Sequence, residues 1–259
     1  NDAIRRKENA PVKPELTLML GWNIRALTII NEMDNYVSKG SVTKVVSSFD
    51  IAENERKSVI DNMKNMKVEF TIADTTKKEI IDNLNVTSYD HILLLCYKEH
   101  MELQEADALT LITLLHLRRI SEETGVNMNI VSEMLDIQNR ELAEVTKADD
   151  FIVSDKLISL LMTQVSENKH LMRVFENLFQ SEGCEIYLKP ISNYVTTGIP
   201  INFYTVLESA KLKKETAIGY RITSEAFNNK NAYGVRVNPI KSEIVTFSES
   251  DKIIVISED

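Results

Sequence analysis

The sequence predicts a doubly wound α/β protein, in which helices cover both faces of a parallel sheet, followed by a small α+β subdomain. Three observations lead to this class. Apolar, strand-like runs alternate with helical patterns six times in the first part of the chain. No proline occurs between Pro14 and Pro190, so this part has few irregular loops. The remaining tail holds short strand-like runs with turn signals between them.

The six strands of the first part are expected in a regular order along the chain. They are LTLML (16–20), TKVVSSF (43–49), KVEFTIA (67–73), HILLLC (91–96), NMNIVSEM (127–134) and DFIVS (150–154). Helical patterns follow the first five, over 23–37, 51–63, 75–84, up to about Glu123, and 136–145. This alternation is typical of a Rossmann-like sheet, in which the first and fourth strands flank the crevice where ligands bind.

Two further helices are expected over 155–182, because apolar residues recur there three or four positions apart and the polar SENK (166–169) interrupts them. Their apolar stripes have two possible partners, the parent domain or a second copy. The candidate interface residues are Leu161, Val165, Leu171, Phe175 and Phe179. We therefore divide the chain into a linker (1–15), a Rossmann-like domain (16–154), crossover helices (155–183) and a C-terminal subdomain (184–259).

The C-terminal subdomain is expected to contain a small sheet. Its candidate strands are CEIYLKPI (184–191), PINFYTVL (200–207), TAIGYRIT (216–223), YGVRVN (233–238), SEIVTF (242–247) and DKIIVISED (251–259). Because the last of these ends the chain, we expect it at an edge of the sheet.

Charge and composition exclude several classes of function. The net charge is −9, with 39 acidic and 30 basic residues, and the basic ones are interspersed, so no nucleic-acid partner is expected. No apolar run approaches the roughly 18 to 20 residues that cross a bilayer, so we expect no direct membrane contact. Two cysteines far apart in the sequence favour a reducing, cytosolic setting. No catalytic set or zinc spacing is found, so an enzyme is not expected.

The turn after the first strand contains only part of a dinucleotide-binding signature. That signature has three glycines, and here their positions hold Gly21, Asn23 and Ala26. Alanine is an accepted third residue, whereas the side chain of Asn23 occupies the space that a pyrophosphate oxygen needs. Trp22 adds bulk, and Arg25 offers a charge to an anion. A purely structural turn is the alternative, and NAD or an adenine nucleotide is the less favoured ligand.

Carboxylates follow several of the expected strands. Asp50 follows the second strand and Asp74 ends the third, while Glu99 and Glu102 follow the fourth. The carboxyl ends of parallel strands share one edge of the sheet, so these oxygens are candidate ligands of a divalent cation such as calcium. The alternative for each is a local role, because acidic residues at a helix start also complement the helix dipole.

Particular stretches of the chain resemble the CASTOR/POLLUX family of ion channels. GWNIRA (21–26) is similar to that family's Gly-Trp-Arg-Arg turn, and EADALTLITLLHLR (105–118) to its helix built around Ala-Asp-Ser-Arg and a leucine run. SEMLDIQNRELAEVTKADDFIVSDKLIS (132–159) resembles its Ser-Glu-Ile-Leu-Asp segment and the elements after it. The match continues through 168–190 and IGYR (218–221), so it spans most of the chain.

This resemblance implies a regulator-of-potassium-conductance (RCK, TrkA-like) domain of a tetrameric cation channel. Family members carry two such domains after the pore, and these domains form a gating ring on the cytoplasmic face of the membrane. For this chain the resemblance implies self-association with a neighbouring RCK domain, a pore outside the chain, and calcium as a possible ligand. A ligand in the crevice is then expected to change the angle between neighbouring domains and so transmit binding to the pore.

Two other functions compete with this interpretation. A soluble nucleotide-binding regulatory subunit of a potassium transporter would share the fold but lack pore helices of its own. An NAD-dependent oxidoreductase would need a working phosphate turn and a proton donor. Asn23 disfavours the latter. The first residue, Asn1, and the charged leader favour a fragment of a longer channel chain.

Overall fold

The computed structural model describes residues 3–5, 13–136, 150–180, 183–226 and 228–258. The chain divides into two compact units, one formed by residues 12–167 and the other by residues 1–11 with 168–259. Most of the helix expected over 136–145 lies outside the described residues. The proposed functional division into linker, Rossmann-like domain, crossover helices and subdomain stays a prediction.

The unit of residues 12–167 is built on a parallel sheet with the strand order β3-β2-β1-β4-β5-β6. Its strands are β1 (Leu16–Leu20), β2 (Ser41–Ser47), β3 (Met66–Ile72), β4 (His91–Leu94), β5 (Ile130–Met134) and β6 (Asp150–Val153). The predicted doubly wound, Rossmann-like fold is confirmed, because the order reverses between β1 and β4. The carboxyl ends of these two strands therefore form the crevice where such folds bind their ligands.

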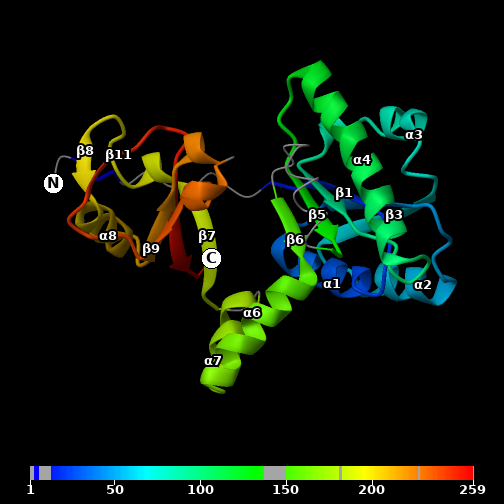
Figure 1. Cartoon of the computed structure of the whole chain (residues 1–259), viewed down its shortest axis with the longest axis horizontal. Helices are drawn as coiled ribbons and strands as arrows, with labels where there is room; N and C mark the ends of the chain where they lie inside the picture. Colours follow the sequence, from blue (N-terminus) through cyan, green and yellow to red (C-terminus); the bar gives the residue numbers. More distant parts are fainter. Residues whose placement is uncertain (1–2, 6–12, 137–149, 181–182, 227, 259) are drawn as a thin grey trace. The chain divides into compact units, whose positions relative to one another are not determined.

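Helices cover both faces of this sheet (Figure 1). They are α1 (Ala26–Tyr36), α2 (Glu53–Asn62), α3 (Lys78–Asn83) and α4 (Leu103–Thr124), and α6 (Ser154–Glu167) follows β6. Side chains of β1 alternate between the two layers. Leu18 packs in one core cluster with Ile81 of α3 and Leu114 of α4, whereas Met19 packs in another with Ile30 of α1. This burial of both strand faces explains why the expected strands are nearly continuous apolar runs.

The unit containing residues 168–259 has an antiparallel sheet of order β10-β9-β12-β7 and a separate pair, β11-β8. Its elements are α7 (Leu171–Phe179), β7 (Glu185–Pro190), β8 (Pro200–Asn202), α8 (Phe203–Leu212), β9 (Thr216–Arg221), β10 (Val235–Val237), β11 (Ile244–Thr246) and β12 (Lys252–Ser257). The expectation that the last strand lies at an edge was wrong. Strand β12 pairs with β9 on one side and β7 on the other, and Ile253, Ile254 and Val255 are buried on its two faces.

The strand expected over 200–207 was also wrong after its third residue, because α8 begins at Phe203. The side-chain oxygen of Asn202 accepts a hydrogen bond from the backbone N–H of Thr205 and caps the helix. Phe203, Val206 and Ala210 are buried at helical spacing. The apolar alternation in PINFYTVL predicts a strand, but the cap at Asn202 and the burial of one helix face in the core favour a helix instead.

Gly21 directly follows β1 and lies against the backbone of Leu95, which directly follows β4. It has φ +96°, a conformation that side-chain-bearing residues rarely adopt, and a β-carbon there would collide with the backbone carbonyl of Leu95. Its own N–H donates to the carbonyl oxygen of Val46 at 2.9 Å, and Leu95 N–H donates to Leu20 at 2.8 Å. The glycine is therefore required by packing between strands, whatever the crevice binds.

We predict that Gly21→Ala destabilises the protein far more than Gly125→Ala. Gly125 also has a positive φ, +69°, but its β-carbon position is open. Left-handed backbone alone costs about 1–2 kcal/mol for alanine, and the Gly21 variant adds a collision with rigid backbone. The free energies of unfolding from urea titrations compare the two. Equal losses for both variants would contradict the packing role of Gly21.

Candidate functional site

Asn23 is the centre of the crevice between the ends of β1 and β4. It is 3% exposed, and its Nδ2 donates to the Cys96 carbonyl at 2.9 Å and to Glu133 Oε2 at 2.7 Å. Its Oδ1 accepts the backbone N–H of Arg25 at 3.0 Å, and its carbonyl accepts that of Ala26 at 2.9 Å. In a dinucleotide-binding turn a glycine at this position leaves room for the pyrophosphate. Here the Asn23 side chain fills that room and bonds to the end of β4 and to β5.

Glu133, near the end of β5, is the partner that the sequence analysis missed. It is 7% exposed, and its Oε1 lies 2.7 Å from Arg25 Nη2. Its Oε2 accepts the amide of Asn23 and lies 3.2 Å from the Cys96 thiol. A buried carboxylate is stable only when it is paired and hydrogen-bonded, and these contacts supply both. The signal was a glutamate inside the apolar strand IVSEM, which had no visible reason to be there.

The Cys96 thiol lies within this network and is held in its neutral form. Burial is the main cause that raises its pKa well above the ordinary value, and the neighbouring Glu133 charge raises it further. A thiol that does not ionise is a poor nucleophile and a poor metal ligand. Cys96 therefore serves as a structural partner of Glu133 at this site.

Trp22 belongs to the core. Its side chain is 6% exposed and meets Phe70 edge to face, with ring centroids 5.8 Å apart. The indole Nε1 donates to Glu55 at 3.2 Å. Its bulk packs the turn in a core cluster with Val59 of α2, and a contact of Trp22 with a ligand stays a prediction.

The four candidate cation ligands have separate local roles. Asp50 is exposed and pairs with Arg56 at 3.1 Å. Asp74 accepts the Thr76 hydroxyl at 2.6 Å, which is the main cause that lowers its pKa, and it lies 3.8 Å from Lys77 Nζ.

Glu102 precedes the first residue of α4, at the position favoured by the helix dipole, and Glu99 is exposed. Within the described residues, no three acidic, histidine or cysteine side chains converge as a metal site. The structure does not bring these four carboxylates together, and cation binding at this edge of the sheet stays a prediction.

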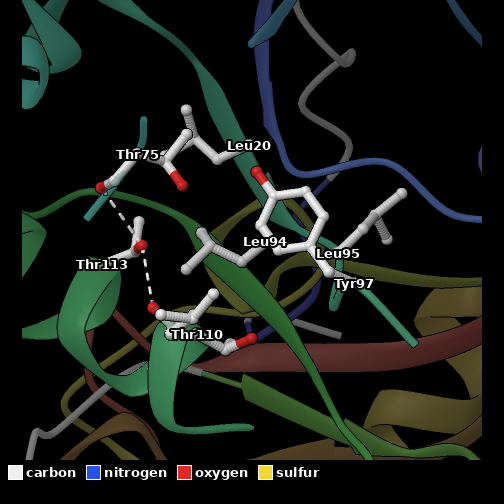
Figure 2. Close-up of a pocket in the computed structure, with 8 residues that line it drawn as sticks. Leu20, Thr75, Leu94, Leu95, Tyr97, Thr110 and Thr113 are labelled. Carbon is white, nitrogen blue, oxygen red and sulfur yellow. Dashed lines mark hydrogen bonds between the residues drawn. The ribbon is translucent and has the colours of Figure 1, made fainter. Parts of the chain in front are cut away.

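A small cavity lies beside the crevice, between the strand ends and α4 (Figure 2). Its volume is about 10 Å³. That is room for about one water molecule, whereas ligand sites for drug-sized molecules run to about 300 Å³ or more. The residues that line it are Leu20, Thr75, Leu94, Leu95, Tyr97, Leu109, Thr110 and Thr113.

The polar side chains that line this cavity already have hydrogen-bond partners within the protein. Tyr97 donates to Ser48 Oγ at 3.1 Å and accepts the Ser48 N–H at 2.9 Å, and the Thr113 hydroxyl approaches the Thr75 carbonyl at 3.2 Å. The cavity as it stands cannot hold a nucleotide.

The helices α6 and α7 carry the predicted interface residues. Leu161 and Val165 on α6 and Leu171 and Phe175 on α7 are half-buried, and Phe179 is 59% exposed. The rings of Phe175 and Phe179 stack 6.2 Å apart. No helix in the described part of the chain is both long and apolar enough to span a membrane.

The geometry defines a class: a Rossmann-like domain in which a buried polar network around Asn23 and Glu133 occupies the turn after β1. No protein-family model matches the chain. The ion channel DMI1 of Medicago truncatula is 26% identical over 255 residues, covering 85% of this chain and 29% of that protein. The probable ion channel POLLUX of Oryza sativa subsp. japonica is 27% identical over 283 residues, covering 96% of this chain and 28% of that protein. The predicted resemblance to CASTOR/POLLUX ion channels is confirmed over most of the chain.

The solved structure of the human SLO3 gating ring has the same fold. It superposes with a TM-score of 0.61 at 14% identity, covering 95% of this chain and 44% of that chain. The GsuK RCK domain superposes with a TM-score of 0.42 at 11% identity, covering 96% of this chain and 45% of that chain. The chain spans less than a third of the two plant channels. The plant relatives are named as ion channels, and the SLO3 structure shows the shared fold.

We predict that Asn23→Ala lowers the free energy of unfolding by about 1–3 kcal/mol, because it leaves Glu133 and the Cys96 carbonyl short of a donor in a buried site. Asn54→Ala, on the exposed surface of α2, is the matched control and should change stability by less than about 0.5 kcal/mol. Chemical unfolding of both variants measures the difference. A near-neutral Asn23→Ala would show that the crevice network does not hold the strand ends together.

Proposed function

We propose that this chain is the ligand-sensing, gating-ring domain of a tetrameric cation channel, on the cytoplasmic face of the membrane. The pore lies outside this chain, and the domain transmits ligand binding to it. The likeness to CASTOR, POLLUX and DMI1 ion channels over most of the chain supports the channel part of this proposal. The fold shared with the SLO3 gating ring supports the ring part.

The observation that carries the proposal is the apolar surface of α6. Leu157, Ile158, Leu160 and Met162 are 48%, 51%, 55% and 67% exposed. Four large apolar side chains exposed within six residues of one helix favour a contact with another protein. A neighbouring RCK-type domain in a ring is the partner that the relatives favour.

A ligand acts on such a ring by binding one arrangement more tightly than the other. Full switching from about 1% to about 99% requires roughly 5.5 kcal/mol of differential binding, which a ring divides among its subunits. Each subunit then needs only about 1–2 kcal/mol. Calcium is the ligand that the plant resemblance implies, and NAD is disfavoured because Asn23, Arg25 and Glu133 occupy the crevice with bonds to one another.

We predict that Leu160→Glu weakens self-association by at least about tenfold, because it places a charge in an apolar contact. Thr163→Glu adds the same charge at an exposed position on the opposite face of the same helix and is the control. Sedimentation velocity over a range of concentrations measures the association constant of each variant. If Thr163→Glu and Leu160→Glu associate alike, or if the wild type stays a monomer at high concentration, the apolar face of α6 is not the interface.

We further predict that isothermal titration with NAD gives no binding heat, since NAD binding would require breaking the Glu133 network. A parallel titration with calcium tests the cation prediction, with Asp50→Asn/Asp74→Asn/Glu102→Gln as the matched variant. Calcium heat that this triple variant abolishes would place the cation at the strand ends. NAD heat that Asn23→Gly strengthens would overturn the closed crevice.

A further inference from the structure

The four-stranded sheet of the second unit has one face that α8 does not cover. Tyr220 of β9 and Ile253 and Val255 of β12 point toward the core that contains α8. Alternation along the strands places Arg221 of β9 and Lys252 of β12 on the opposite side. We call this opposite side the outer face.

Two cations lie next to each other on the outer face. Arg221 and Lys252 are register partners in the antiparallel pair β9·β12. Like charges directly opposite each other on a sheet destabilise it unless something compensates them. Such a pair is therefore unusual in a chain whose net charge is −9 and which has acidic residues available.

Neither cation has an acidic partner among the residues that the structure describes. The Nε of Arg221 is buried and makes no hydrogen bond. Asp251, next to Lys252, is 2% exposed and uses its two oxygens to accept the N–H groups of Thr223 and Ser248, both at 2.8 Å. Both oxygens of Asp251, the carboxylate nearest to Lys252 in the sequence, thus accept backbone N–H groups.

The same unit pairs its other partly buried cations. Arg236 lies 2.8 Å from Glu225, and Lys189 lies 2.9 Å from Glu215.

A buried N–H without an acceptor costs about 1–3 kcal/mol. Arg119 of the other unit also has a buried Nε that makes no hydrogen bond, but its Nη atoms pair with Asp82 and Glu123. Arg221 has no carboxylate partner among the described residues, and an anion bound part of the time would supply one.

The surface beside the two cations is apolar. Ile254 lies two residues from Lys252 and faces Leu188 of β7 in the register, and Val237 of β10 continues the row. Leu188 and Val237 are 50% and 63% exposed, whereas Ile254 between them is 5% exposed and offers a ligand almost no surface. A ligand held at the cationic end would place an uncharged part of itself against Leu188 or Val237.

We propose that Arg221 and Lys252 bind the phosphate group of a small organic phosphate on the outer face. Two adjacent positive charges match a phosphate monoester dianion better than a singly charged carboxylate. A guanidinium presents Nε–H and Nη–H side by side, the geometry that phosphate oxygens accept. Binding through Nε requires the Arg221 side chain to turn outward, and the phosphate then supplies the acceptor that this buried atom lacks. This site is independent of the proposed channel function.

The test is a ¹⁵N NMR titration of the whole chain that observes arginine Nε–H groups. Loss of a resonance in Arg221→Lys assigns the reporter, and the probes are AMP, inorganic phosphate and adenosine. We expect AMP and phosphate to shift the Arg221 Nε–H signal and AMP to bind more tightly, while adenosine leaves it unmoved. The Arg25 Nε–H signal should stay in place, since a nucleotide in the crevice would move that one instead.

Variants measured by calorimetry give a second readout. Arg221→Gln and Lys252→Gln should each weaken AMP binding by at least about tenfold, the loss of one charge-assisted contact. Lys211→Gln removes an exposed charge from α8 and should change the affinity less than twofold. An unmoved Arg221 signal at millimolar AMP, equal binding of adenosine, or unchanged affinity in Lys252→Gln would each overturn the proposal. If Arg221→Gln fails to fold, the titration of the wild-type Arg221 Nε–H signal still tests the proposal.

Discussion

The buried Glu133 carboxylate is the interaction on which the crevice depends. It joins the end of β5 to the turn after β1 through Asn23 and Arg25, at 2.7 Å in both cases, and to β4 through Cys96. Removing a charge from water costs several kcal/mol unless well-placed partners offset that cost. Loss of any one partner of Glu133 is therefore expected to lower the free energy of unfolding. The groups that stabilise the strand ends therefore occupy the position where a dinucleotide-binding turn has its second glycine.

The fold was predictable because its signal is local and repeated. Alternating apolar runs and helical patterns define the parallel sheet, and the strand order follows from general rules of doubly wound folds. Asn23 was also recognised as an obstacle to phosphate from its position alone. The role of Glu133 was not predicted, because it lies 110 residues from Asn23 in the chain. Their contact depends on β1, β4 and β5 lying side by side in the sheet. Long-range polar pairs of this kind have no pattern in a single sequence.

The second unit was harder to predict because its elements are short. A run such as PINFYTVL has strand-like composition, and only the cap at Asn202 and the buried spacing of Phe203 and Val206 make it a helix. Strand β12 was misplaced for a related reason: being last in sequence says nothing about position in an antiparallel sheet. Its uninterrupted KIIVI was the available signal, because a strand with apolar residues on both faces is typical of the middle of a sheet.

The pattern of paired and unpaired charges points to different roles for the two units. At the strand ends of the first unit, Arg25 and Asp50 both have partners of opposite charge within 3.1 Å. In the second unit, Arg221 and Lys252 sit side by side with no acidic partner among the described residues. If the phosphate site proposed above is correct, an anion binds to the second unit and leaves the Glu133 network intact. The domain can then bind an anion without breaking the buried hydrogen bonds at the ends of the parallel strands.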